Sequence, residues 1–95
     1  MDDDLFRGGK IHIRIQPNPR KRSYLTTIEG LETDLDLQSI AGALRKMCNC
    51  GVRVLKDVIT KKEVIRLQDD HRDTVMLFLT SEKICQKEQI VKHGF

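Results

Sequence analysis

The residues in this sequence with the clearest chemistry are cations gathered in one stretch. Residues 5–28 contain six arginine and lysine side chains and no aspartate or glutamate. These six are Arg7, Lys10, Arg14, Arg20, Lys21 and Arg22. Residues 1–4 add three aspartates, and residues 29–95 carry eleven basic and eleven acidic side chains. The net charge of +3 therefore conceals a neutral body with one basic arm, which favours a polyanion as partner. The alternative is a solvated hairpin whose cations only protect a sheet edge.

The other candidate motifs do not support catalysis. His71-Arg72-Asp73 has the letters of the kinase catalytic triplet, but no asparagine follows at the expected offset and no glycine-rich loop is present. Asp69, Asp70 and His71 could act as metal ligands, although the start of a helix explains both carboxylates more simply. Because no nucleophile motif or phosphate loop is present either, we expect a binding module and not an enzyme.

Three cysteines could form a metal or redox site. The number of cysteines is odd, Cys48 and Cys50 are separated by a single residue, and Cys85 is distant. This pattern favours reduced thiols over a disulfide framework. A zinc site would need a fourth ligand, and a C-x-C pair with scattered histidines is a weak signal. We therefore expect no metal and no cofactor, with Cys48 and Cys50 packed as small apolar residues.

A β-hairpin is predicted to position the basic arm. Isoleucine occupies every second position of residues 11–15, which is the period of a half-buried strand. His12 and Arg14 would then face solvent. Residues 23–29 form a second run, rich in β-branched and aromatic side chains, that is typical of a strand.

The loop of this hairpin is expected at residues 17–22, because Pro17 and Pro19 cannot donate to a β-ladder. Its apex is then Arg20-Lys21-Arg22. Residues 1–9 have little apolar surface and are expected to form a mobile tail, which leaves residues 10–95 as a single domain.

A first helix is predicted after Asp34 or Asp36, either of which could cap it. Apolar side chains then recur at helical spacing and form one stripe. They are Leu37, Ile40, Ala41, Leu44, Met47 and Cys48. Arg45 and Lys46 lie off this stripe, near a stop signal at Asn49.

A second helix is predicted over roughly residues 71–81. Asp70 and Asp73 have the spacing of a shortened capping box at its start. Val75, Phe78 and Leu79 would face the core.

Three further strands are predicted at residues 52–54, at residues 63–68 and near the end of the chain. In the connection at residues 57–62, Val58 and Ile59 could either extend the strand or cover the core. The order ββαββαβ fits an α+β two-layer sandwich, with one mixed sheet of four to five strands and both helices on one face.

Size and composition limit the function classes. Ninety-five residues suffice for one small core and are few for an enzyme with a buried cleft. An aromatic content of 4% argues against a stacking platform for single-stranded nucleic acid. No apolar run has membrane-spanning length, and the acidic N-terminus does not fit a signal peptide. We therefore expect a cytoplasmic monomer without membrane contact.

Four segments, in order along the chain, together resemble a known family. They are residues 11–16 (IHIRIQ), 25–31 (LTTIEGL), 63–72 (EVIRLQDDHR) and 93–95 (HGF). The family is eukaryotic translation initiation factor 1, the start-codon selection factor, with its archaeal relatives. The resemblance implies a ββαββαβ domain on the small ribosomal subunit beside the decoding site. There it would promote scanning and oppose premature accommodation of initiator tRNA, and correct codon pairing would expel it.

The resemblance also implies roles for individual residues. Ribosomal RNA contacts would come from the hairpin, its tip and the first helix, namely from Arg14, Asn18, Arg20, Lys21, Arg22, Arg45 and Lys46. The connection between the third and fourth strands would face the tRNA with Asp57, Val58, Lys61 and Lys62. Other initiation factors would be further partners. The family's usual loop, Arg-Asn-Gly-Arg-Lys, is altered here, because a proline stands on each side of Asn18 and the glycine is absent.

Two alternatives stay open at this point. The same domain could serve reinitiation or non-standard initiation as a specialised relative. It could also be a protein-docking module without direct RNA contact, in which the basic loop is incidental.

Overall fold

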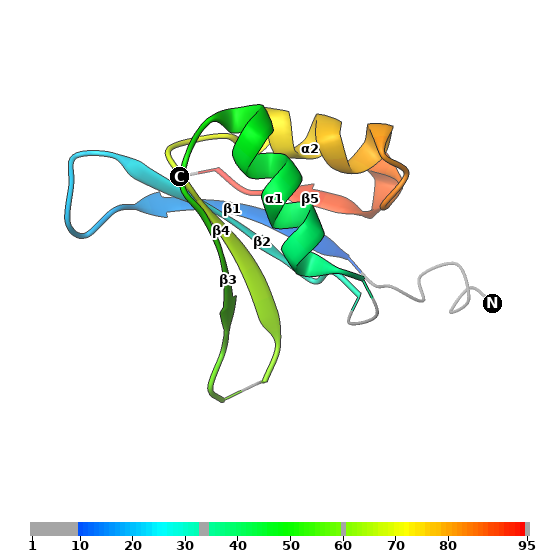
Figure 1. Ribbon diagram of the computed structural model, residues 1–95, viewed down its shortest axis with the longest axis horizontal. Helices are drawn as coiled ribbons and strands as arrows, with labels where there is room; N and C mark the ends of the chain where they lie inside the picture. The colour runs from blue at the N-terminus through cyan, green and yellow to red at the C-terminus, as the bar shows by residue number, and fades with distance from the viewer. Residues whose placement is uncertain (1–9, 33–34, 60, 95) are drawn as a thin grey trace.

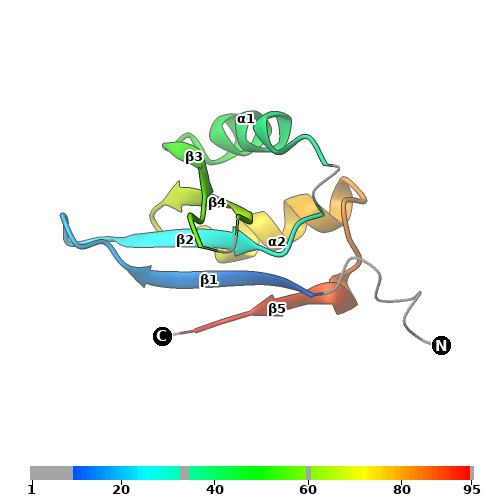
Figure 2. The same ribbon diagram turned by 90° about the horizontal axis from the view of Figure 1, so that it is seen from below.

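A five-stranded mixed sheet with two helices on one face forms the protein, as expected from the sequence (Figures 1 and 2). The computed structural model describes residues 10–32, 35–59 and 61–94. Its elements are β1 (Ile11–Pro17), β2 (Tyr24–Glu29), α1 (Leu37–Cys48), β3 (Val52–Lys56), β4 (Glu63–Gln68), α2 (Arg72–Ser81), the 3-10 helix η2 (Lys87–Gln89) and β5 (Ile90–Lys92). The strand order is β3-β4-β2-β1-β5. The predicted tail at residues 1–9 lies outside the described residues.

The alternating pattern of β1 determines which of its faces is buried. Ile11, Ile13 and Ile15 are buried, whereas His12 is half-buried and Arg14 is exposed. β1 pairs with β2 in antiparallel register as far as Pro17 opposite Tyr24. Pro17 therefore belongs to the strand, and its predicted place in the loop was wrong. A proline is tolerated there because it stands at the end of the strand, where the ladder stops.

The predicted closing strand is present as β5, which pairs in parallel with β1. The backbone N–H of His93 continues this pairing by donating to the carbonyl of Ile13 at 2.9 Å. Gly30 directly follows β2 and lies against the residue that precedes β1, since it has a φ of +92° and a Cβ there would overlap the carbonyl oxygen of Lys10. This position requires glycine.

α1 begins and ends at the residues that its sequence indicates. Asp36 is the N-cap, and its carboxylate accepts hydrogen bonds from the Ser39 hydroxyl at 2.8 Å and the Ser39 backbone N–H at 3.1 Å. These two bonds lower the pKa of Asp36. Asn49 ends the helix in the left-handed conformation, with a φ of 52°. The alternative cap, Asp34, lies outside the described residues.

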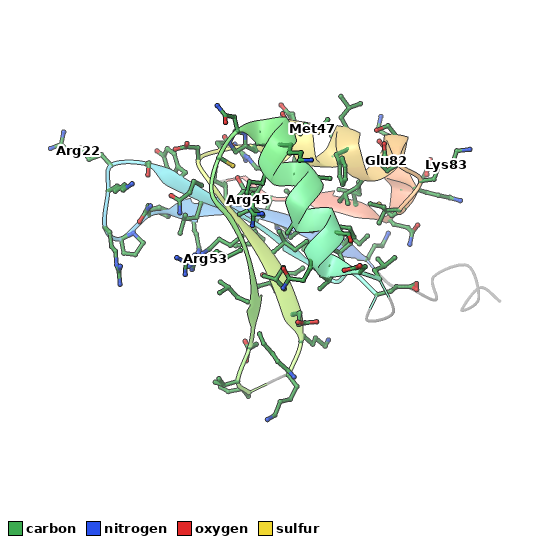
Figure 3. All side chains as sticks on the ribbon, in the orientation of Figure 1. Arg22, Arg45, Met47, Arg53, Glu82 and Lys83 are labelled. Carbon is green, nitrogen blue, oxygen red and sulfur yellow. The ribbon has the colours of Figure 1, made fainter. Side chains whose placement is uncertain are left out.

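One member of the predicted stripe of α1 does not face the core. Met47 is 50% exposed, whereas Leu37, Ile40, Ala41 and Leu44 are buried. Taking 100° per residue, Met47 lies about 80° from Leu37 around the helix axis, at the edge of the stripe. That edge faces solvent here (Figure 3).

α2 begins without the predicted capping box. Its N-cap is His71, which makes no side-chain capping bond. The carboxylate of Asp70 instead accepts two hydrogen bonds from the guanidinium of Arg72, at 2.9 and 2.8 Å. Asp73 accepts from Nζ of Lys92 in β5 at 2.7 Å. Asp70 also accepts from the backbone N–H of Arg72 at 3.3 Å. Each of the two carboxylates thus has a cationic partner, which makes these side-chain hydrogen bonds charge-assisted.

One hydrophobic core joins the sheet to both helices. Its fully buried members include Ile13, Ile28, Leu44, Ile65, Leu67, Val75 and Leu79. Each such side chain contributes about 1.5–3 kcal/mol by leaving water. The predicted inward residues of α2 are confirmed, since Val75, Phe78 and Leu79 are all buried. Among the described residues, no helix has the length and apolar character to cross a membrane.

Candidate nucleic-acid interface

Asn18 shapes the tip of the β1–β2 hairpin, which projects from the body of the protein (Figure 1). Its side-chain Oδ1 accepts from the backbone N–H of Arg20 at 3.0 Å. Its own backbone N–H donates to the carbonyl of Ser23 at 2.9 Å and closes the loop. This arrangement is an Asx turn, in which the side chain imitates a backbone turn. Asn18 was predicted to contact RNA, and in this structure its oxygen holds the loop.

The tip presents three cations to solvent. Arg20, Lys21 and Arg22 are all exposed. Within the described ranges, none of the three takes part in an ion pair. Figure 3 shows Arg22 extending beyond the loop, away from the rest of the molecule. The tip is therefore not folded back onto the acidic groups that the structure describes, and its charge is available to a partner.

Arg14 differs from the tip cations because it has an acidic neighbour. It lies on the open face of β1, where its Nε is 3.3 Å from Oε1 of Glu29 on β2. The two side chains are 45% and 40% exposed, so the pair is screened by water and weak. The charge of Arg14 is partly balanced within the sheet.

The two predicted cations of α1 also differ from each other. Arg45 donates from its guanidinium to the carbonyl of Val52 at 2.9 Å, which joins the last turn of α1 to the start of β3. Lys46 is exposed. Both lie in the last turn, where cations interact favourably with the helix dipole. One donor of the Arg45 guanidinium is thus used within the fold, and Lys46 is the cation more available to a binding partner.

Sequence reasoning missed two arginines that the sheet brings into line with Arg14. Arg14 lies opposite Thr27, Thr27 lies opposite Arg66, and Arg66 lies opposite Arg53. These four positions form one row across β1, β2, β4 and β3, on the face that the helices leave open. Arg53 is exposed and Arg66 half-buried. Strand alternation could have placed each arginine on this face, but only the register shows that they share a row.

The tip of the second hairpin, between β3 and β4, has a different character. Asp57 closes it, because its Oδ1 accepts from the backbone N–H of Ile59 at 2.7 Å and its backbone N–H donates to the carbonyl of Lys62 at 2.8 Å. Val58 and Ile59 are 83% and 85% exposed. Both expectations for them were wrong, since they neither extend the strand nor cover the core. Lys61 and Lys62 beside them are also exposed.

Cys48 and Cys50 border the core, as expected for small apolar residues. Both are half-buried, and burial is the main cause that raises the pKa of each thiol. The structure adds a neighbour that the sequence did not indicate. The two sulfur atoms and a ring nitrogen of His71 all lie within 4.8 Å of one another.

Comparison with known proteins supports the resemblance seen in the sequence. The family model described as translation initiation factor SUI1 matches residues 7–85. The chain is 43% identical over 94 residues to protein translation factor sui1 of Schizosaccharomyces pombe, covering 99% of this chain and 84% of that protein. It is 37% identical over 94 residues to eIF-1 of Saccharomyces cerevisiae, covering 99% and 85%. It is 34% identical over 96 residues to human eukaryotic translation initiation factor 1, covering 98% and 83%.

The fold is also similar to that of a solved structure, the C-terminal domain of human eIF2D. The TM-score is 0.75, and the match covers 86% of this chain and 41% of that one. Sequence identity is 19%, so this likeness concerns the fold. The family model and the full-length relatives go further, because they describe translation initiation factors and not enzymes. This chain belongs to the SUI1 family of translation initiation factors.

Proposed function

We propose that this protein binds the small ribosomal subunit near the decoding site, with the tip of the β1–β2 hairpin against ribosomal RNA. The observation that carries the proposal is the set of exposed tip cations, Arg20, Lys21 and Arg22, held on a closed loop. Phosphate contacts from such side chains give affinity that depends on salt and little on sequence. Further phosphate contacts in this proposal come from Arg45 and Lys46 on α1 and from Arg14 on the open face of the sheet.

A small number of phosphate contacts suits a factor that must dissociate when the correct codon is paired. The proposed role is to promote scanning and to oppose premature accommodation of initiator tRNA, so that correct codon pairing displaces the factor. The β3–β4 tip would face the tRNA with Asp57, Val58, Lys61 and Lys62. Two ligands that compete for the same space weaken each other's binding reciprocally. Such a role places the protein in the cytoplasm, as a monomer that also meets other initiation factors.

Charge reversal at the tip tests the first part of this proposal. Lys21→Glu/Arg22→Glu is compared with Lys83→Glu/Lys87→Glu, which changes the net charge equally at exposed positions beyond α2. We expect the tip variant to lose small-subunit binding at least tenfold and the matched variant to stay within about threefold. Equal losses would mean that net charge alone drives binding, and would contradict a specific role for the hairpin.

Footprinting tests the second part. Hydroxyl-radical cleavage of small-subunit rRNA is compared with and without the protein. We expect protection of rRNA beside the decoding site, lost in the Lys21→Glu/Arg22→Glu variant. Protection elsewhere on the subunit alone would contradict the proposed location, even if binding itself is retained.

A further inference from the structure

We propose that Cys48, Cys50 and His71 form a zinc site at the junction of α1 with the turn between β4 and α2. The two sulfur atoms and a ring nitrogen of His71 lie within 4.8 Å of one another. In a tetrahedral zinc site, Zn–S bonds of about 2.3 Å and Zn–N bonds of about 2.0–2.1 Å place neighbouring ligand atoms roughly 3.5–3.8 Å apart. Side-chain adjustments of about 1 Å would therefore complete the site.

The backbone brings the two thiols to the same place. Cys48 is the last residue of α1, and Asn49 follows in the left-handed conformation with a φ of 52°. This reversal ends the helix and returns Cys50 toward Cys48. The C-x-C spacing, a weak signal for a metal site in the sequence, therefore brings both thiols within reach of one ion. The carboxyl end of a helix also favours a nearby cation.

A separate set of hydrogen bonds fixes the third ligand. The backbone N–H of His71 donates to Oγ1 of Thr26 at 2.9 Å, and that hydroxyl donates to the carbonyl of Asp69 at 2.6 Å. Thr26 is completely buried in β2. His71 is thereby held against the sheet, in the turn that passes beside the end of α1 (Figure 1).

A second observation points to a ligand here. Nε2 of His71 is buried, and among the described residues it has no hydrogen-bond partner. A buried nitrogen without a partner is unfavourable, and in native structures it often indicates an unseen ion or water. A cation bound through this atom would satisfy it.

The donor set specifies the kind of ion. Two cysteine sulfurs and one imidazole match Zn²⁺, which accepts sulfur and nitrogen ligands. On binding, both thiols would release their protons to solvent and the imidazole would bind in its neutral form. Two thiolates balance the charge of the ion. The fourth position would be held by water or by a ligand from outside, since the cluster supplies three ligands.

Cobalt binding tests the site directly. The full chain, stripped of metal and kept reduced with a thiol-free reductant, is titrated with Co²⁺. We expect one ion per chain, thiolate-to-cobalt charge-transfer absorption in the near-ultraviolet and strong visible bands of tetrahedral cobalt. Added Zn²⁺ should displace the cobalt, and zinc should raise the thermal midpoint because it binds only the folded chain.

Three variants separate this site from unspecific thiol binding. Cys50→Ser and His71→Gln should each weaken Co²⁺ binding at least tenfold. Cys85→Ala is the matched control, because Cys85 is a free thiol outside the cluster, and it should keep the wild-type spectrum and affinity. Circular dichroism confirms that each variant is folded, and Cys48→Ala replaces Cys50→Ser or His71→Gln where that variant is not.

The proposal is overturned by any of three results. These are a wild-type protein without charge-transfer absorption, a Cys85→Ala variant as impaired as Cys50→Ser, or a folded His71→Gln variant with unchanged spectrum and affinity. None of these measurements involves the ribosome, so they stand apart from the proposed role in initiation.

Discussion

The two hairpin tips of this protein are closed by similar hydrogen bonds and present different side chains. Asn18 closes the β1–β2 tip and Asp57 closes the β3–β4 tip, each through a side-chain oxygen that accepts from the backbone two residues later. The first tip then presents Arg20, Lys21 and Arg22, whereas the second exposes Val58 and Ile59. Figure 1 shows both projecting from the sheet in different directions. The fold thus supplies two projections, and their side chains suit them to different partners.

A second contrast lies among the cations themselves. Arg14 has Glu29 beside it, and Arg45 donates to the carbonyl of Val52. The tip cations have no such partners within the described part of the chain. Net charge would count all of them equally, but the three tip cations are exposed, adjacent in sequence and, within the described residues, in no ion pair. The tip is therefore where binding energy should concentrate.

The largest expected effect separates the two tips. Arg20→Glu/Lys21→Glu/Arg22→Glu should weaken small-subunit binding by on the order of a hundredfold, since each charge-assisted contact contributes about 1 kcal/mol or more. Val58→Ser/Ile59→Ser should change binding to subunits without tRNA by less than about threefold. Fluorescence anisotropy with labelled protein measures both. Similar losses for the two variants would remove the proposed division between the tips.

A smaller effect is expected from the cation that is tied to the fold. Arg45→Ala should lower the free energy of unfolding by about 1–2 kcal/mol, because the Val52 carbonyl loses its partner. Lys46→Ala should change it by less than about 0.5 kcal/mol. Urea denaturation measures both values. If Lys46→Ala proves the more destabilising of the two, the structural role assigned to Arg45 is wrong.

Loss of the Asx turn should have a milder effect. Asn18→Ala should lower the free energy of unfolding by about 0.5–1 kcal/mol, because the loop loses the hydrogen bond from the Arg20 backbone. Small-subunit affinity should fall only severalfold, since the three cations remain. Asn18→Asp keeps the accepting oxygen and is the control for stability. A stability loss in Asn18→Asp equal to that in Asn18→Ala would argue against the turn.

The smallest expected effect is on the stability of the folded protein at low pH, through an ion pair outside the two hairpin tips. The Arg72 guanidinium lowers the pKa of the Asp70 carboxyl below its usual value. The stabilisation from this pair is therefore complete above the unfolded pKa of about 3.9 and is lost as the pH falls through the lower folded value. Asp70→Asn should be slightly less stable than wild type at pH 6, and the difference should be smaller at pH 3, below the unfolded pKa. Urea midpoints at the two pH values test this, and a difference that stays the same in acid would contradict it.

Local patterns predicted much of the fold because the deciding forces here are local. The isoleucines of β1 show their buried face by alternation alone. Asp36 and Asn49 mark the ends of α1 through backbone chemistry that needs no distant partner. The location of the basic tip followed from the same reasoning, since the strands on either side define the loop.

The errors arose where distant residues decide. Asp73 is held by Lys92, nineteen positions away, and no local sequence motif indicates that pairing. The arginine row of Arg14, Arg66 and Arg53 depends on the register of four strands. His71 meets Cys48 and Cys50 only because β4 returns beside the end of α1. The spacing of residues along the sequence does not show which of these distant residues come together in the fold.

Salt dependence of binding is the most direct test of the free tip cations. Small-subunit affinity is measured over a series of salt concentrations for wild type and for Arg20→Ala/Lys21→Ala/Arg22→Ala. Each lost phosphate contact should reduce the slope of log affinity against log salt by about 0.7–0.9. We expect the slope of the variant to be shallower by about 2–3. An unchanged slope would mean that these side chains stay solvated in the complex, and would contradict binding through the tip.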